Sequence, residues 1–201
     1  MRLQFDANQQ FQLDAIASVV DLFDGQPVGD PEFTTINLGA WSEGLLEGKE
    51  RTELGIGNCL LLDDEKLLAN TRAVQERNDI DLDAAEDEGT PGDLEAWELF
   101  DQPANAARRC PHFSVEMETG TGKTYVYLRT IFELSQRYGF QKFIIVVPSV
   151  AIREGVLKNI EITAEHFRAL YNNLPFEHFV YDAKKVNRLR QFAVSNTLQI
   201  L

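Results

Sequence analysis

The sequence predicts an α/β fold in which a parallel sheet carries helices on both faces, with an acidic lobe inserted near its start. Three observations favour this fold. Strand-like and helix-like segments alternate from about residue 111 onward. Residues 143–147 are apolar at every position, as a strand buried on both faces requires. A glycine-rich turn at residues 120–124 joins an apolar run to a helix-forming segment.

The first expected element is a short amphipathic helix over residues 11–23, which Gly25 and Pro27 follow. Residues 26–110 lose this periodicity and become rich in Gly, Pro and acids, with one clear helix at 63–77. We interpret them as an inserted lobe. Its acidic run at 79–93 contains no Lys or Arg, which is typical of a solvated loop. A second interpretation is an acidic tail that binds a partner or mimics DNA.

The third part, residues 111–201, is expected to be a sheet with flanking helices. The strands are predicted at 112–117, 142–147, 178–181 and 198–201, and the helices at 123–138, from near 149, and at 183–194. The chain is therefore divided into residues 1–25, 26–110 and 111–201.

Residues 119–124 have the features of a phosphate-binding loop. Gly120 and Gly122 allow backbone N–H groups to curl around phosphate oxygens, and Lys123 adds a cation. The Thr124 hydroxyl is the expected Mg²⁺ ligand, and the dipole of the following helix adds attraction for an anion. Met117 occupies a position where Gly or Ala is usual, so the sequence departs from the common motif. An ordinary glycine-rich turn is the alternative.

Charge is divided unevenly along the chain. Residues 1–110 carry 24 acidic and 8 basic side chains, whereas residues 111–201 carry 8 acidic and 11 basic ones, giving net charges of −16 and +3. Phosphate contacts are made by Lys and Arg, so a nucleic-acid surface is expected in the second part. The sequence shows no membrane span and no signal peptide, and we expect a cytoplasmic protein with reduced cysteines.

Three segments occur in the order of one known family. They are residues 11–16 around Gln12, residues 117–131 around the glycine-rich turn, and residues 144–156 around Pro148. With further similarity at 55–58 and 181–190, the chain resembles the restriction (Res) subunit of type III restriction–modification enzymes. The resemblance implies a superfamily 2 motor with RecA-like domains, which uses ATP and acts on double-stranded DNA together with a methyltransferase subunit.

By position, the resemblance implies roles for individual residues. Gln12 would contact adenine, and the loop would hold the phosphates and Mg²⁺ through Thr119, Gly120, Thr121, Gly122, Lys123 and Thr124. Of these, Lys123 and Thr124 would be catalytic. DNA contacts are expected from Pro148, Ser149 and Arg153, and from a basic helix that carries Lys184, Lys185 and Arg188. The alternative for each is a structural role: a helix cap for Ser149 and a solvated face for the basic residues.

A catalytic carboxylate is missing from the sequence pattern. Asp182 follows a strand-like run but lacks the second acidic residue that a motor of this kind carries. We therefore expect a fragment that binds ATP and is inactive by itself. Another superfamily 2 motor of the type I restriction or repair kind, and a non-catalytic nucleotide-binding or assembly module, are the alternative hypotheses.

Overall fold

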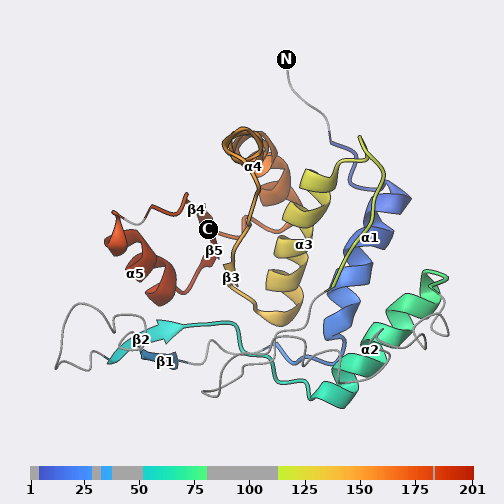
Figure 1. Ribbon diagram of the computed structural model, residues 1–201, viewed down its shortest axis with the longest axis horizontal. Coiled ribbons are helices and arrows are strands. Elements are labelled where there is room, and N and C mark those ends of the chain that lie inside the picture. The colour runs from blue at the N-terminus through green and yellow to red at the C-terminus, as the bar shows by residue number, and fades with distance from the viewer. Residues whose placement is uncertain (1–4, 29–32, 38–51, 81–112, 183) are drawn as a thin grey trace. The chain divides into compact units, whose positions relative to one another are not determined.

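The computed structural model describes residues 5–28, 33–37, 52–80, 113–182 and 184–201 (Figure 1). They belong to two compact units. One comprises Met1–Asp6, Pro27–Leu60 and Tyr127–Leu201, and the other comprises Ala7–Gln26 and Leu61–Val126. No helix in the described part of the chain has the length and hydropathy of a membrane span.

The first unit contains a three-stranded parallel sheet in the order β3-β5-β4. Its strands are β3 (Lys142–Phe143), β4 (Phe176–His178) and β5 (Leu198–Ile200). The central strand β5 is fully buried, and Gln199 pairs with Lys142 on one side and with Glu177 on the other. The predicted parallel sheet is therefore confirmed over these strands.

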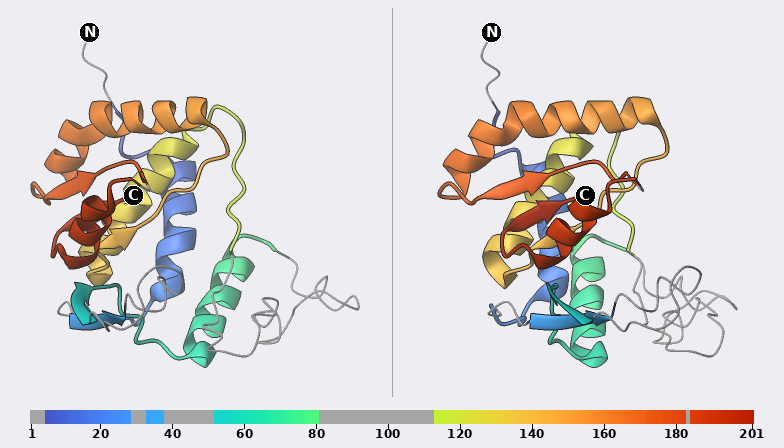
Figure 2. Two further views of the ribbon diagram at one scale, coloured as in Figure 1. Left: turned by 60° about the vertical axis from the view of Figure 1, so that its left-hand side comes forward. Right: turned by 90° about the vertical axis from the view of Figure 1, so that its left-hand side faces the viewer.

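Helices lie on both faces of this sheet, as the alternating pattern predicted. On one face, Phe132 of α3 (Lys123–Tyr138) stacks on Phe167 of α4 (Val150–Leu170) and meets Phe176 of β4 edge-on. On the other face, Phe192 of α5 (Val186–Val194) meets Phe179 just beyond β4. Figures 1 and 2 show α3 and α4 on the side of the strands opposite α5.

An antiparallel hairpin of β1 (Phe33–Asn37) and β2 (Thr52–Ile56) belongs to the same unit and was not predicted. Asn58, two residues after β2, ties this region to the start of β3. Its amide accepts from the main-chain N–H groups of Gln141 and Lys142 and donates to the Lys142 carbonyl oxygen. One asparagine thus satisfies three main-chain groups at the start of an edge strand.

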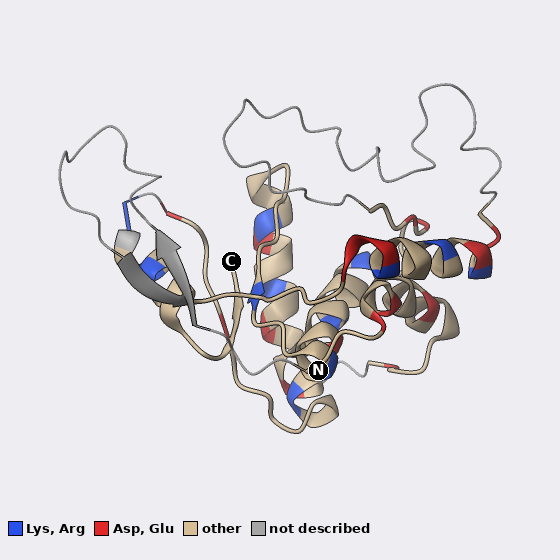
Figure 3. Ribbon diagram, turned by 90° about the horizontal axis from the view of Figure 1, so that it is seen from below, with Lys and Arg blue, Asp and Glu red and all other residues tan. Residues whose placement is uncertain are grey.

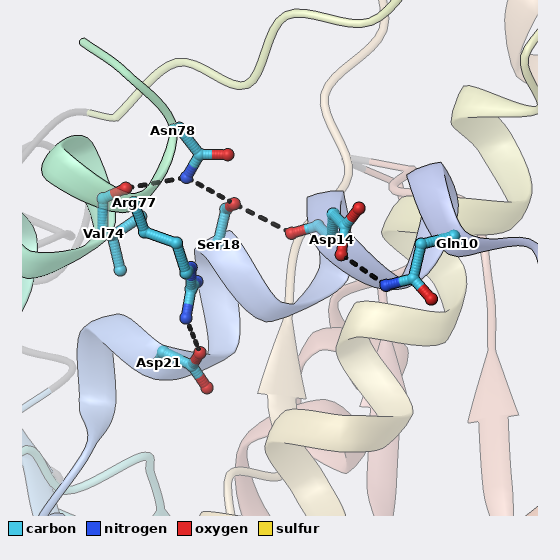
Figure 4. Close-up of polar contacts among 7 residues, drawn as sticks. All are labelled: Gln10, Asp14, Ser18, Asp21, Val74, Arg77 and Asn78. Atoms are coloured by element: carbon cyan, nitrogen blue, oxygen red, sulfur yellow. Dashed lines mark hydrogen bonds and ion pairs between the residues drawn. The ribbon is translucent and has the colours of Figure 1, made fainter.

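The second unit is built on α1 (Gln10–Val20), the 3₁₀ turn η1 (Asp21–Phe23) and α2 (Asp64–Arg77), close to the predicted helices. Asp63 caps α2 by accepting from the Lys66 N–H, and more acids follow in the first turn (Figure 3). Figure 4 shows two contacts between the helices: Arg77 pairs with Asp21 at 2.6 Å, and Asn78 donates to the Ser18 hydroxyl at 3.2 Å.

A buried asparagine also joins these two helices. Asn70 of α2 is 6% exposed, and its Nδ2 donates to the carbonyl oxygens of Leu22 and Asp24. The turn after α1 leaves these carbonyls without helical partners, so Asn70 supplies the donors that the helix end lacks.

Several predicted strands differ from the structure. Residues 113–118 form no strand, and His112 lies outside the described residues. The 142–147 strand is limited to β3, and Ile144 and Val146 are 64% and 88% exposed instead of buried. The strand predicted at 178–181 begins earlier, as β4. The Ile145 N–H still bonds to the Leu201 carbonyl oxygen beyond β5, so the difference lies mainly in side-chain burial, which depends on distant segments that an apolar run cannot reveal by itself.

The predicted helices at 63–77, 123–138 and 183–194 agree with α2, α3 and α5 to within three residues. Most of the acidic run, residues 81–93, and Cys110 lie outside the described residues.

Candidate functional site

The glycine-rich loop has the backbone conformation that its sequence predicted. Gly120 and Gly122 have φ angles of +86° and +84°, which side chains with a Cβ rarely adopt. Between them, the Thr121 hydroxyl donates to the Glu118 carbonyl oxygen at 2.7 Å and closes the turn. The Val126 N–H then bonds to the Gly122 carbonyl oxygen and starts α3. Two left-handed glycines before a helix are typical of a concave array of main-chain N–H groups.

The charge around the start of α3 suits an anion. Lys123 is exposed and forms no ion pair with the residues that the structure describes, so its ammonium is available. The first turn of α3 carries no acidic residue, and a helix N-terminus has a partial positive charge. Space is available as well, because none of the described residues places an atom within 4 Å of a Cβ built on Gly120.

Gln12 contacts this loop from the neighbouring helix α1. Its side-chain Nε2 donates to the Thr121 carbonyl oxygen at 2.9 Å, and the residue is 8% exposed. A Cβ built on Gly122 would stand 2.8 Å from the same Nε2, closer than real Cβ contacts allow. The sequence placed Gln12 and the loop in one site, but the Gln12–Thr121 hydrogen bond could not be read from the sequence, since the residues are 109 positions apart.

These residues fit a nucleotide with Mg²⁺. The loop offers main-chain donors, a free cation and the Thr124 hydroxyl, which is partly exposed. No cluster of His, Cys, Asp or Glu capable of holding a metal by itself occurs in the described ranges. A cation at this site would therefore depend on the phosphates for most of its ligands, as Mg²⁺ at nucleotide sites commonly does.

In the other unit, the predicted DNA-contact residues begin α4. Ser149 is the N-cap of this helix, and its Oγ accepts from the Ile152 N–H at 3.3 Å, so the capping role is confirmed. Pro148 is exposed, and Arg153 pairs with Glu154 at 2.9 Å on the surface.

Arg153 also lines a cavity of about 520 Å³ at the carboxyl ends of the parallel strands. The remaining walls are mostly aliphatic and come from the segments after β3, β4 and β5 and from α4, with His178 and Tyr181 among them. Ligands of open α/β sheets bind outside this end of the strands, so Arg153 lies on the side where such folds bind ligands.

The second basic group precedes and begins α5. Lys184, Lys185 and Arg188 are exposed, and α5 itself carries arginines but no acidic residue. Asp182 accepts from the Lys184 N–H, which lowers the pKa of its carboxyl, and lies 3.4 Å from the Lys185 ammonium. Asp182 is thus engaged in the turn that leads into α5.

Comparisons with known proteins find one matching family and several relatives. Residues 70–197 match the family described as the Type III restriction enzyme, res subunit. The chain is 45% identical to the StyLTI Res subunit of Salmonella typhimurium over 82 residues, which are 40% of this chain and 8% of that protein.

Two further relatives are the EcoP15I Res subunit of Escherichia coli, 51% identical over 59 residues, and the EcoPI Res subunit of Escherichia phage P1, 44% identical over 73 residues. These matches cover 28% and 35% of this chain, but only 6% and 7% of the relatives. The match to 70–197 covers well over half of the chain, and on this ground the protein belongs to the type III restriction enzyme Res-subunit family.

Proposed function

We propose that this chain is the ATP-binding N-terminal part of the DNA-translocating restriction subunit of a type III restriction–modification endonuclease. The observation that carries the proposal is the pair of left-handed glycines directly before Lys123 at the start of α3. The family and its Res-subunit relatives support a restriction role. In this proposal, residues 111–201 are the first part of a RecA-like domain, residues 26–110 are an insertion and residues 1–25 carry Gln12.

Within the proposed site, main-chain N–H groups of residues 119–124 bind the phosphates, and the Lys123 ammonium neutralises their outer oxygens. The Thr124 hydroxyl is a ligand of Mg²⁺, and Gln12 contacts the adenine. When bound, MgATP supplies the phosphoanhydride bond whose cleavage drives a motor. Lys123 and Thr124 act on the reacting phosphates. The described residues therefore supply the groups that bind the nucleotide.

Isothermal titration with MgATP tests the nucleotide site. The 201-residue chain should bind at millimolar concentration or tighter, and Lys123→Ala should abolish the heat. Lys158→Ala is the matched control, because Lys158 is an exposed lysine that pairs only with Glu161 on α4. Equal heats for wild type and Lys123→Ala would refute the site.

For DNA, we propose backbone contacts by Pro148, Ser149 and Arg153 and by the α5 group of Lys184, Lys185 and Arg188. Exposure, basic charge and the position of Arg153 at the carboxyl edge of the sheet support this. A triple Ala variant of the α5 group should weaken binding to a double-stranded oligonucleotide and reduce its salt dependence. Lys158→Ala should change neither, and unchanged binding by the triple variant would refute the α5 contact.

The partner proposed is the methyltransferase subunit of the same system, because the relatives are subunits of restriction–modification enzymes. Co-purification of this chain with a modification subunit of a type III system tests the proposal. Failure of the two chains to associate at micromolar concentration would count against an interface within these residues.

A further inference from the structure

We propose that Gln12 fixes the orientation of the peptide between Thr121 and Gly122 and so pre-organises the loop for phosphate, whether or not a base is bound. The inference rests on the proposed nucleotide site and adds a positioning role to a residue that sequence reasoning assigned only to adenine.

The side chain of Gln12 is positioned as a hydrogen-bond donor to the loop. Gln12 is the third residue of α1, its own N–H bonds to the Gln9 carbonyl oxygen, and the residue is buried. Its Nε2 lies 2.9 Å from the Thr121 carbonyl oxygen. The side chain therefore links a regular helix to a loop that contains no regular structure of its own.

The bond to Gln12 also determines where the Gly122 N–H points. A trans peptide is planar, and its carbonyl and N–H point in opposite directions. With the Thr121 carbonyl directed at Gln12, the Gly122 N–H is directed away from α1. Rotation of this peptide would turn a carbonyl oxygen to the side where the N–H now points, and oxygen repels phosphate. Glycine flanks the peptide on one side and permits such rotation, so an external bond is needed to prevent it.

The fit at Gly122 is tight. Only a residue without a Cβ leaves Gln12 Nε2 room to reach the carbonyl, because a Cβ would stand 2.8 Å from it. Among the residues that the structure describes, Gly120 has no such neighbour. The two glycines thus have similar φ angles but different surroundings, since Gly122 also leaves space for the side-chain amide of Gln12.

The amide chemistry allows both roles together. A primary amide has two N–H donors and a carbonyl acceptor. One N–H to Thr121 leaves the other N–H and Oε1, which are the donor and acceptor that an adenine edge needs. Gln12 therefore connects base recognition with the shape of the phosphate loop.

The test compares two ligands, MgATP and magnesium tripolyphosphate, which has the phosphates but no base. Titration calorimetry is performed on wild type, Gln12→Ala and Gln12→Met, the last of which fills similar space without a donor. Loss of one neutral hydrogen bond predicts tripolyphosphate binding weaker by about 3- to 10-fold in both variants. Gln10→Ala is the matched control, since Gln10 lies on the same helix and its side chain donates to Asp14 and not to the loop in the structure described.

The outcomes distinguish a role of Gln12 in base recognition from a role in positioning the loop. Tripolyphosphate affinity unchanged in Gln12→Met, with ATP affinity reduced, would limit Gln12 to reading the base and overturn the inference. Weaker tripolyphosphate binding by Gln12→Met, measured at a temperature well below the melting transition of both proteins, would support it, because the variant is then fully folded and lacks only the donor to Thr121. Absence of binding by wild type to either ligand would instead refute the proposed nucleotide site.

Discussion

Substitution of the two loop glycines by alanine separates backbone strain from the contact with Gln12. Gly120 and Gly122 differ by only 2° in φ, so forcing a Cβ into this conformation should cost each variant a similar amount, about 1–2 kcal/mol. In the described part of the chain, the Gly122 Cβ meets a neighbour, the Gln12 amide at 2.8 Å, whereas the Gly120 Cβ meets none. Displacing that amide loses its hydrogen bond and leaves the Thr121 carbonyl unpaired, which adds about 1–2 kcal/mol.

The free energy of unfolding should therefore fall by about 1–2 kcal/mol in Gly120→Ala and by about 2–4 kcal/mol in Gly122→Ala. Urea denaturation followed by far-ultraviolet circular dichroism measures both values under one set of conditions. In a Gln12→Ala background the extra cost of Gly122→Ala should disappear, since no amide remains to be displaced. Equal losses for the two glycine variants in the wild-type background would refute the reasoning.

Four further predictions concern single residues. Burial lowers the pKa of Lys142 from 10.5 to about 8, so the free energy of unfolding should rise between pH 8 and 10.5. Because Lys142 is partly exposed, the rise should be about 1–2 kcal/mol, and Lys142→Met should abolish it in urea denaturation. Burial, followed by the hydrogen bond to Glu133, raises the pKa of Tyr171, so stability should fall above pH 10 in wild type but not in Tyr171→Phe. Asn70→Ala should cost about 2–4 kcal/mol in urea denaturation by orphaning two carbonyls, and a loss below 1 kcal/mol would contradict their pairing. Ser149→Ala should cost about 1 kcal/mol in the same assay through its lost cap, and an unchanged midpoint would contradict the cap.

The helices could be predicted because their signals are local. Asp63 and Ser149 mark helix starts through caps that need only three residues, and the apolar period of α1 and α3 extends over several turns. The glycine-rich turn was equally readable, since positive φ at Gly120 and Gly122 is a property of glycine itself.

The strands and contacts depended on distant partners. An apolar run at 144–147 looks like a buried strand, but whether it pairs is decided by another segment, and here Val146 is largely exposed. The three bonds of Asn58 to the start of β3 span more than 80 residues and leave no mark in local composition. The hairpin β1–β2 was hidden because its strands lack strict alternation and stand in an acid-rich region.

For the candidate site, sequence reasoning found the residues but not their connection. Gly120 and Lys123 were identified from the glycine-rich pattern and Gln12 from the family resemblance, whereas the bond from Gln12 to Thr121 required the structure. The nucleotide roles of Gln12 and of residues 119–124 stay predictions, as do the roles of the DNA-contact residues.

Amide nuclear magnetic resonance of the labelled chain during titration with MgATP would test the phosphate loop residue by residue. The largest shifts should occur at the N–H groups of Gly120, Gly122 and Lys123, and Lys123→Ala should remove them. Shifts confined to residues elsewhere, or none at saturating MgATP, would contradict the assignment of this loop as the triphosphate site.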